Sequence, residues 1–147
     1  MNLVWKDKEI ENLQEVGVIV GRYQVPELTE AHRILINAVI ARHTQCILVI
    51  GISNKRTPDN PLSYEERFEM IHEIFPSILI IPLADVTTDS QWSINLNNLI
   101  EACVPKQPIC LYGGRDSFIK SYSGKHKTFE FGLKHPQVGL KLGNQLN

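Results

Sequence analysis

The sequence has little that would place the protein at a membrane or on nucleic acid. Its 147 residues carry a formal net charge of −1, and no apolar run approaches a membrane span of roughly 20 residues. A near-neutral chain gives no overall field that attracts nucleic acid or a membrane surface. Segment 1–15 contains acidic residues and no continuous apolar core, which argues against a signal peptide. We therefore expect a cytoplasmic protein that binds neither nucleic acid nor a membrane.

Cysteine is scarce, and the usual catalytic and metal-binding spacings are missing. Cys46, Cys103 and Cys110 lie far apart, and the first and last of these fall inside apolar runs that predict buried strands. We interpret them as small core side chains in a reducing compartment rather than as metal ligands or a disulfide. The chain has no CxxC, no HExxH, no GxxxxGK[ST], no GxGxxG after its first strand and no Ser/His/Asp order. Zinc hydrolysis and covalent nucleophilic catalysis are therefore unsupported, and we predict no metal site.

What the chain does have is a regular alternation of apolar patterns. Short continuous apolar runs, typical of strands buried on both faces, occur at 16–20, 46–50, 78–81 and 109–112, and a last strand is predicted at 128–131. Helical spacing occurs at 30–42, 63–75 and 90–103, and a short helix is expected after Asp116. This order predicts an α/β fold: a doubly wound, mostly parallel five-stranded sheet with helices on both faces. The domain spans 16–132, between an N-terminal extension, 1–15, and a C-terminal tail, 133–147.

Local signals support two of the predicted helices. Ser63 and Glu66 have the spacing of a capping box, and Phe68, Ile71 and Phe75 follow as an apolar stripe. In the helix at 90–103 one side is formed by Trp92, Leu96, Leu99 and Cys103. Trp92 is by default a core residue, and it can stack on a flat ring only if the start of this helix faces a cleft.

The polar and cationic residues gather in the loops after the strands. In a parallel sheet these loops meet at one edge, so they predict a binding site there. In the first loop, GRYQVPELTEAH, Thr29 is a natural N-cap and His32 follows in the first helical turn, where unpaired N–H groups favour anions. The alternative reading is a plain cap and a half-exposed histidine, which local sequence alone favours.

The second and fourth loops also have two interpretations each. The second loop holds Lys55, Arg56 and Asn60, with Arg67 one turn into the helix, and is either an anion site or a solvated basic turn. Arg67 could equally pair with a nearby glutamate on the surface. Asp85 belongs to the third loop. In the fourth loop glycine allows close approach of a ligand to the backbone, and Arg115 is either a phosphate contact or part of a local ion pair.

Taken together, the four loops resemble those of the HxGH nucleotidyltransferase superfamily, which is cytidylyltransferase-like and Rossmann-like in fold. The likeness is greatest to nicotinamide-nucleotide adenylyltransferases of the bacterial and archaeal type. It rests on GRYQ at 21–24 with TEAH at 29–32, ISNKRTPDNPLSYEERFEMI at 52–71, DVTTDSQW at 85–92 and LYGGRDSFI at 111–119. Four motifs in order over about 16–131 are far more specific than any one of them.

The resemblance implies adenylyl transfer from ATP to nicotinamide mononucleotide (NMN), giving NAD and pyrophosphate, with Mg²⁺ accompanying ATP. Relatives of this class often assemble, so a homo-oligomer is possible. The implied catalytic residues are His32, Thr29 and Arg22. The implied ATP-binding residues are Gly21, Arg22, Tyr23, Gln24, His32, Arg56, Gly113, Gly114 and Arg115. The implied NMN-binding residues are Asn60, Arg67, Asp85 and Trp92.

The chain departs from the family pattern at two points. Thr29 replaces the first histidine of HxGH and Ala31 replaces its glycine; threonine offers a hydroxyl but cannot become cationic. After the last predicted strand there is no ISSTxxR-like run, which leaves open a truncated or degenerate relative, or a contact supplied by another subunit or a cation. Two other functions therefore stay open: a nucleotide-binding protein without catalysis, and a transferase of the cytidylyl or pantetheine-phosphate type.

Overall fold

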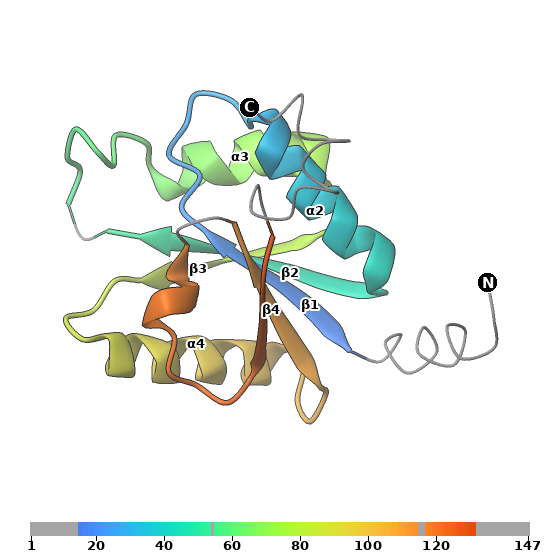
Figure 1. Cartoon of the computed structure of the whole chain (residues 1–147). Coiled ribbons are helices and arrows are strands. Elements are labelled where there is room, and N and C mark those ends of the chain that lie inside the picture. Colours follow the sequence, from blue (N-terminus) through green and yellow to red (C-terminus); the bar gives the residue numbers. More distant parts are fainter. Residues whose placement is uncertain (1–14, 54, 115–116, 132–147) are drawn as a thin grey trace.

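The protein forms a single five-stranded parallel sheet, as the alternation of strand and helix patterns predicts. The computed structural model describes residues 15–53, 55–114 and 117–131. The strand order is β3-β2-β1-β4-β5, with every neighbouring pair parallel. The chain starts in the middle strand, runs outward to one edge and then returns to build the other half, which is the doubly wound order (Figure 1). The strands are Val16–Gly21 (β1), Gln45–Ile52 (β2), Leu79–Ala84 (β3), Ile109–Gly113 (β4) and Lys127–Glu130 (β5).

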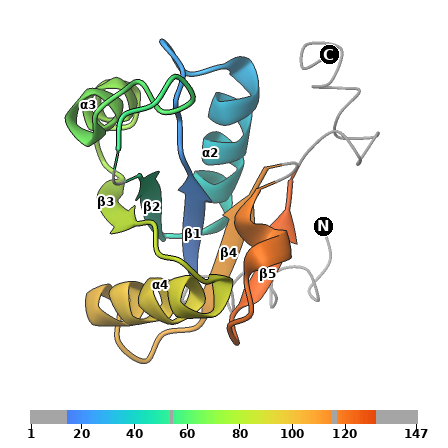
Figure 2. The same ribbon diagram turned by 90° about the vertical axis from the view of Figure 1, so that its left-hand side faces the viewer.

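Helices cover both faces of the sheet. They are Glu30–Arg42 (α2), Tyr64–Ile74 (α3) and Asp89–Cys103 (α4), and a short 3₁₀ helix, η1, covers Phe118–Ser121. Figure 2 shows α2 and α3 on one face and α4 on the other. The core is accordingly split into two buried clusters, one on each face of the sheet. Strand side chains alternate between the faces, so in β1 Ile19 joins the first cluster while Val18 and Val20 join the second.

Each of the three α-helices in the described part of the chain begins at a side-chain cap. Ser63 and Glu66 form the predicted capping box of α3: Glu66 N donates to Ser63 Oγ at 3.1 Å and Ser63 N donates to Glu66 Oε1 at 2.8 Å. Thr88 Oγ1 accepts from Gln91 N at 3.1 Å at the start of α4. Such caps satisfy backbone N–H groups that a helix start leaves unpaired. They fix where the loops after the strands end.

The sequence-based element bounds agree with the structure to within one to three residues at each end, and the short helix after Asp116 is present as η1. One expectation about side-chain burial is wrong: Cys103, expected on the apolar side of α4, is exposed, because the helix ends there. Cys110 is buried and Cys46 half-buried, and burial raises the pKa of Cys46 to about 11, as suits a core thiol. The proposed extension and tail lie outside the described residues, apart from Glu15, so those boundaries remain predictions.

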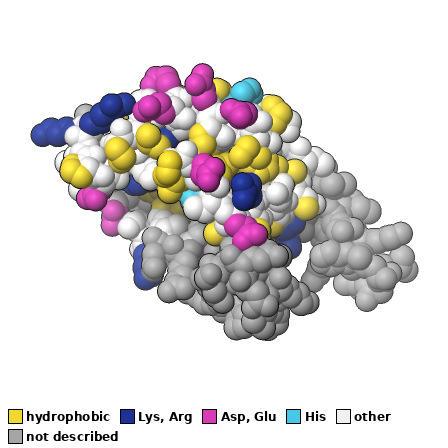
Figure 3. Space-filling model, turned by 90° about the horizontal axis from the view of Figure 1, so that it is seen from above, with side chains coloured by type: hydrophobic (Ala, Val, Ile, Leu, Met, Phe, Trp, Pro, Cys, Tyr) yellow, Lys and Arg dark blue, Asp and Glu magenta, His cyan; other side chains and the backbone are white. Residues whose placement is uncertain are grey.

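The surface carries charges of both signs. The outer face of α2 and α3 shows acidic, basic and apolar side chains intermingled (Figure 3), in keeping with the net charge of −1. In the described part of the chain, none of the helices combines the length and apolarity that crossing a lipid bilayer would require.

A buried polar network lies at the opposite end of β1 from the loops of interest. His43 caps the end of α2, is 5% exposed, and its Nδ1 lies 2.9 Å from the carbonyl oxygen of Glu15. Because a carbonyl only accepts, Nδ1 carries the proton, and Nε2 then accepts from the Tyr112 hydroxyl at 2.6 Å. The neutral ring therefore satisfies both neighbours, and burial lowers the pKa of His43 below its ordinary 6.5.

This network predicts acid sensitivity of the fold. The unfolded chain binds a proton at His43 near pH 6.5 whereas the folded chain resists it, so stability is fully present above pH 6.5 and falls as the pH drops below it. The His43→Gln variant should be less stable than the wild type at pH 7.5 but should lose less further stability by pH 5.5. Urea unfolding at the two pH values measures this. Equal losses in the two proteins would contradict it.

Candidate active site

A cavity opens at the carboxyl ends of the central strands. Its volume is about 770 Å³, within the usual range for ligand pockets. The loop after β1 and the first turn of α2 form one wall, and the start of α4 and the segment after β4 form the other. The main lining residues are Gly21, Arg22, Tyr23, Ala31, His32, Gly51, Asp85, Asp89, Trp92, Gly114, Ser117 and Phe118.

His32 and Thr29 form a reciprocal cap at the start of α2. Thr29 Oγ1 accepts from His32 N at 3.1 Å, and Thr29 N donates to His32 Nδ1 at 3.2 Å. A backbone N–H only donates, so Nδ1 is the unprotonated nitrogen and Nε2 carries the proton. Burial lowers the pKa of His32, which favours this neutral form. His32 thus lines the cavity as an oriented N–H donor, whereas the Thr29 hydroxyl is occupied by the helix start.

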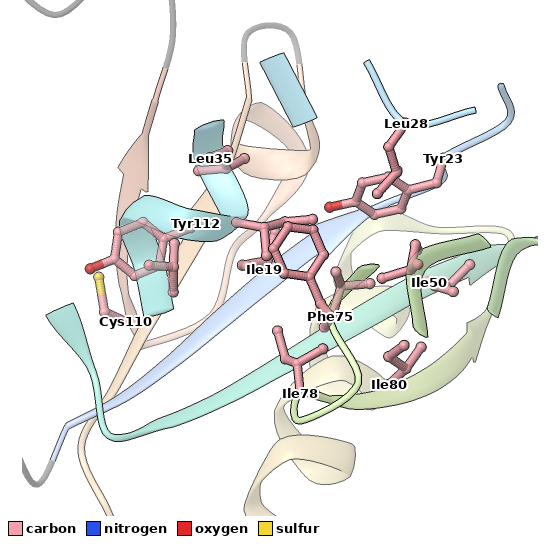
Figure 4. Close-up of a cluster of buried hydrophobic side chains, with 14 residues drawn as sticks. Ile19, Tyr23, Leu28, Leu35, Ile50, Phe75, Ile78, Ile80, Cys110 and Tyr112 are labelled. Atoms are coloured by element: carbon pink, nitrogen blue, oxygen red, sulfur yellow. The ribbon is translucent and has the colours of Figure 1, made fainter. Parts of the chain in front are cut away.

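The turn after β1 is tightly built around Tyr23. This residue has a φ of 55°, in the left-handed region that is rare for a side chain of its size, and it is 6% exposed. Its ring lies over Gly21, where an added Cβ would come within 2.8 Å of the ring, and packs beside Leu28 (Figure 4). The Tyr23 and His32 ring centroids are 5.0 Å apart. Burial raises the pKa of the Tyr23 phenol, so the group stays neutral. The Tyr23 ring therefore packs against the His32 ring.

Arg22 and Asp85 join the two sides of the cavity. The guanidinium Nη2 lies 2.7 Å from Asp85 Oδ1, and both side chains are partly exposed. Asp85 is itself placed by its N–H, which donates to the carbonyl of Ile52 at 2.8 Å. A cation and an anion thus sit side by side in the cavity lining, and each can exchange its partner for a ligand group.

The far wall is aromatic. Trp92 and Phe118 have ring centroids 5.9 Å apart, and both line the cavity. Trp92 is half-buried: part of it packs on the α4-side core, and part faces the cavity. The two interpretations of Trp92, core residue and stacking platform, therefore both describe it. Gly114 has no atom within 4 Å of where a Cβ would stand, so this backbone is open to the cavity.

A second, smaller cavity of about 250 Å³ holds the remaining predicted residues of the first two loops. Gln24 bridges the loops through its amide, which accepts from Leu62 N at 2.8 Å and donates to Leu62 O at 3.1 Å. Arg56 pairs with Glu66 at 3.2 Å on the surface. Asn60 N bonds back to Thr57 O at 2.9 Å. These residues lie apart from the main cavity because the second loop closes on itself.

Arg67 is buried, at the inner side of the second cavity. It is 3% exposed, and its Nη1 donates to the carbonyls of Arg22 and Gly51, both at 2.8 Å. Its Nε donates to the Ser63 carbonyl at 3.1 Å. The guanidinium therefore ties the ends of β1 and β2 to the start of α3. The expected alternative, surface pairing with a glutamate, is wrong, because these three carbonyls take up its donors.

The structure brings some of the predicted site residues together and separates others. Those lining the main cavity are Gly21, Arg22, Tyr23, His32, Asp85, Trp92 and Gly114. Those lining the second cavity are Gln24, Arg56, Asn60 and Arg67. Thr29 lies at the helix cap, Gly113 is buried at the end of β4, and Arg115 lies outside the described residues. Sequence reasoning did not identify Asp89, Ser117 and Phe118 as cavity-lining residues. Their position in the segments that follow β3 and β4 could have predicted it.

No resident metal site is evident in the described ranges, where no three histidine, cysteine, aspartate or glutamate side chains gather as a cation would need.

Comparison with known proteins finds similar solved structures but no related sequences. No protein-family model matches the sequence, and no curated protein matches it. A solved bifunctional NMN adenylyltransferase/ADP ribose pyrophosphatase from Francisella tularensis, complexed with AMP and a Mn ion, superposes with a TM-score of 0.66 at 23% identity, over 80% of this chain and 37% of that one. Two NadR structures are similar at 18% identity over 89% of this chain: one with NAD and AMP-PNP (TM-score 0.63, 41% of its length) and one with NR (0.62, 39%).

These likenesses establish the fold: the chain has the Rossmann-like α/β architecture of these proteins, with a parallel five-stranded sheet. It spans about two fifths of the length of each of them.

The buried position of Arg67 predicts a large effect on stability. Arg67→Met removes the side-chain donor to the carbonyls of Arg22 and Gly51, whereas the Ser63 carbonyl still accepts from the backbone N–H at position 67. The variant should lower the free energy of unfolding by about 3 kcal/mol. Arg56→Met is the matched control: its ion pair is exposed, so its loss should change stability by less than about 0.5 kcal/mol. Urea unfolding of the three proteins measures both. Similar small losses in the two variants would contradict the tying role of Arg67.

Proposed function

We propose that the protein transfers an adenylyl group from ATP to NMN, giving NAD and pyrophosphate. The observation that carries the proposal is the composition of one cavity. An oriented histidine N–H, an arginine, a carboxylate and an indole line it together, at the helix start and strand ends where this fold binds ligands. The NMN adenylyltransferase and NadR structures that share the fold support it.

The polar wall suits phosphates. The start of α2 presents backbone N–H groups and the positive end of the helix dipole. His32 adds its Nε2–H, and Arg22 adds a cation. In adenylyl transfer the phosphate of NMN attacks the α-phosphorus of ATP, the bond from that phosphorus to the bridging oxygen breaks, and pyrophosphate leaves. No protein nucleophile is needed, so the residues act by aligning two polyanions and stabilising the charge that develops on them.

The opposite wall suits a flat ring. Trp92 presents part of its indole to the cavity beside Phe118, and Asp85 stands near the entrance to this wall. An electron-poor nicotinamide ring stacks well on indole, and its positive charge is matched by the carboxylate. This pairing favours NMN over an acceptor such as a pantetheine phosphate.

Mg²⁺ enters in this proposal as the counter-ion of ATP. Mg²⁺ keeps several waters and is commonly held by substrate phosphates. Carboxylates of Asp85 and Asp89 line the cavity and could bind its outer water shell.

A second candidate function, nucleotide binding without catalysis, is favoured by one observation. The Thr29 hydroxyl accepts from the helix backbone, so it offers the cavity less than a histidine would, and Ala31 adds a methyl group to the lining. The two functions agree on the ligand and differ on turnover.

The first test is product formation, measured by mass spectrometry with ATP, Mg²⁺ and NMN. The wild type should form NAD and pyrophosphate above an uncatalysed control. His32→Gln should lower kcat about 100-fold, because it removes an oriented donor to the phosphates. His72→Gln, on the exposed face of α3, is the matched control and should leave kcat unchanged. NAD formation no faster than the control, together with tight binding of ATP, would instead support the second function.

Thr29→His separates the two functions further. Because Thr29 caps α2, the variant should lose about 1 kcal/mol of stability. If the proposed transferase is limited by the missing histidine, the variant should nevertheless form NAD faster per folded molecule. Thermal unfolding and initial rates together measure this. A variant that is less stable and no faster would contradict the idea that position 29 limits the rate.

A further inference from the structure

One polar group in the cavity lining is left without a hydrogen-bond partner. Ser117 lines the cavity after β4, and its Oγ is shielded from solvent. Among the residues that the structure describes, this is the one buried side-chain oxygen or nitrogen with no hydrogen bond. An unpaired buried hydroxyl destabilises a fold, so each such case calls for an explanation.

Ser117 has no local structural task that would account for it. It precedes η1, yet its side chain makes no capping hydrogen bond there. Its hydroxyl is packed instead against the end of β4: the atom nearest to a Cβ added at Gly113 would be Ser117 Oγ, and Ser117 Cβ and the Phe118 ring would each lie 2.9 Å from it. Gly113 thus leaves room for the serine at the cavity wall. A serine side chain has three staggered rotamers, so its hydroxyl can turn toward a cavity ligand without moving the backbone.

The residues around this hydroxyl indicate which kind of ligand group suits it. Positive groups, Arg22 and the start of α2 with His32, lie on the opposite wall and attract phosphate. Ser117 stands instead next to Phe118, whose ring lies beside that of Trp92. Among the described residues that line this wall of the cavity, none is a lysine or an arginine. An uncharged hydroxyl beside aromatic rings suits the neutral polar atoms of a nucleoside, its ribose hydroxyls or its ring amide.

We propose that Ser117 is a ligand-binding residue whose hydroxyl hydrogen-bonds the nucleoside part of the bound nucleotide, not its phosphate. The inference rests on the proposed function for the presence of a nucleotide. It adds a specificity-determining residue on the nucleoside side, and it requires no catalytic turnover.

The test is calorimetric binding of NMN and of nicotinamide riboside, which lacks the phosphate, to the wild type and to Ser117→Ala. The loss of one hydrogen bond should weaken both ligands by about the same factor, roughly tenfold. Thermal unfolding of the ligand-free proteins gives a second readout. Removing an unpaired hydroxyl should leave Tm unchanged or raise it, whereas removing a structural hydrogen bond would lower it.

Two further variants control for side effects. Ser117→Cys keeps the volume with a weaker donor and should give an intermediate loss of affinity. Ser123→Ala, an exposed serine outside the cavity lining, should bind like the wild type.

The outcomes separate this inference from the proposed function. Binding of NMN by the wild type with equal affinity in Ser117→Ala overturns the role of Ser117 and leaves the function standing. A loss confined to the phosphorylated ligand also overturns it, because the hydroxyl would then bind phosphate. A wild type that binds neither ligand overturns the NMN proposal and this inference together. A matched loss for both ligands with an unchanged or higher Tm supports it.

Discussion

The geometry of the site depends on the guanidinium of Arg67. β1 and β2 are parallel neighbours, and the carbonyls of Arg22 and Gly51 at their carboxyl ends accept from a donor on another element. Arg67 donates to the carbonyls of Arg22 and Gly51 at 2.8 Å each, and it reaches them from α3. A single planar group with several donors suits this arrangement better than an ammonium, which lacks the fixed fork. The positions of Arg22 and Tyr23, and through them the support of His32, follow from this tie.

The resulting cavity has two chemically different walls. The β1–α2 side offers donors and positive charge, held by a reciprocal cap between Thr29 and His32. The α4 side offers aromatic surface from Trp92 and Phe118. A ligand with an anionic end and a flat end fits both walls at once, which is the common property of nucleotides. The loops after the strands, which are far apart in sequence, thus form one cavity with two chemically different sides.

Sequence patterns predicted most of the fold, because buried parallel strands and amphipathic helices leave strong apolar signals. They also predicted that the loops after the strands converge, and Gly21, His32, Asp85 and Trp92 do so. For Arg67 the resemblance implied NMN binding and the local sequence offered pairing with a surface glutamate. The second reading is wrong, because the partners of Arg67 are backbone carbonyls, which have no sequence signature. Arg56 and Asn60, which the resemblance implied for ATP and NMN binding, line the second cavity. The sequence could not predict this placement, since the bridge between Thr57 and Asn60 that folds the second loop depends on tertiary structure. The role of Ser117 could not be predicted from the sequence, because an unpaired hydroxyl can be recognised only in the three-dimensional structure.

The ion pair between Arg22 and Asp85 gives each of the two charges in the cavity lining a partner within the protein. A carboxylate tethered 2.7 Å from the guanidinium acts as a resident competitor for any anion that approaches Arg22. In the proposed function, a ligand phosphate at Arg22 would displace this carboxylate, which would then be available to a cationic ring of the same ligand. Under that proposal a zwitterionic ligand would satisfy both charges, whereas a simple phosphate would leave Asp85 without its partner.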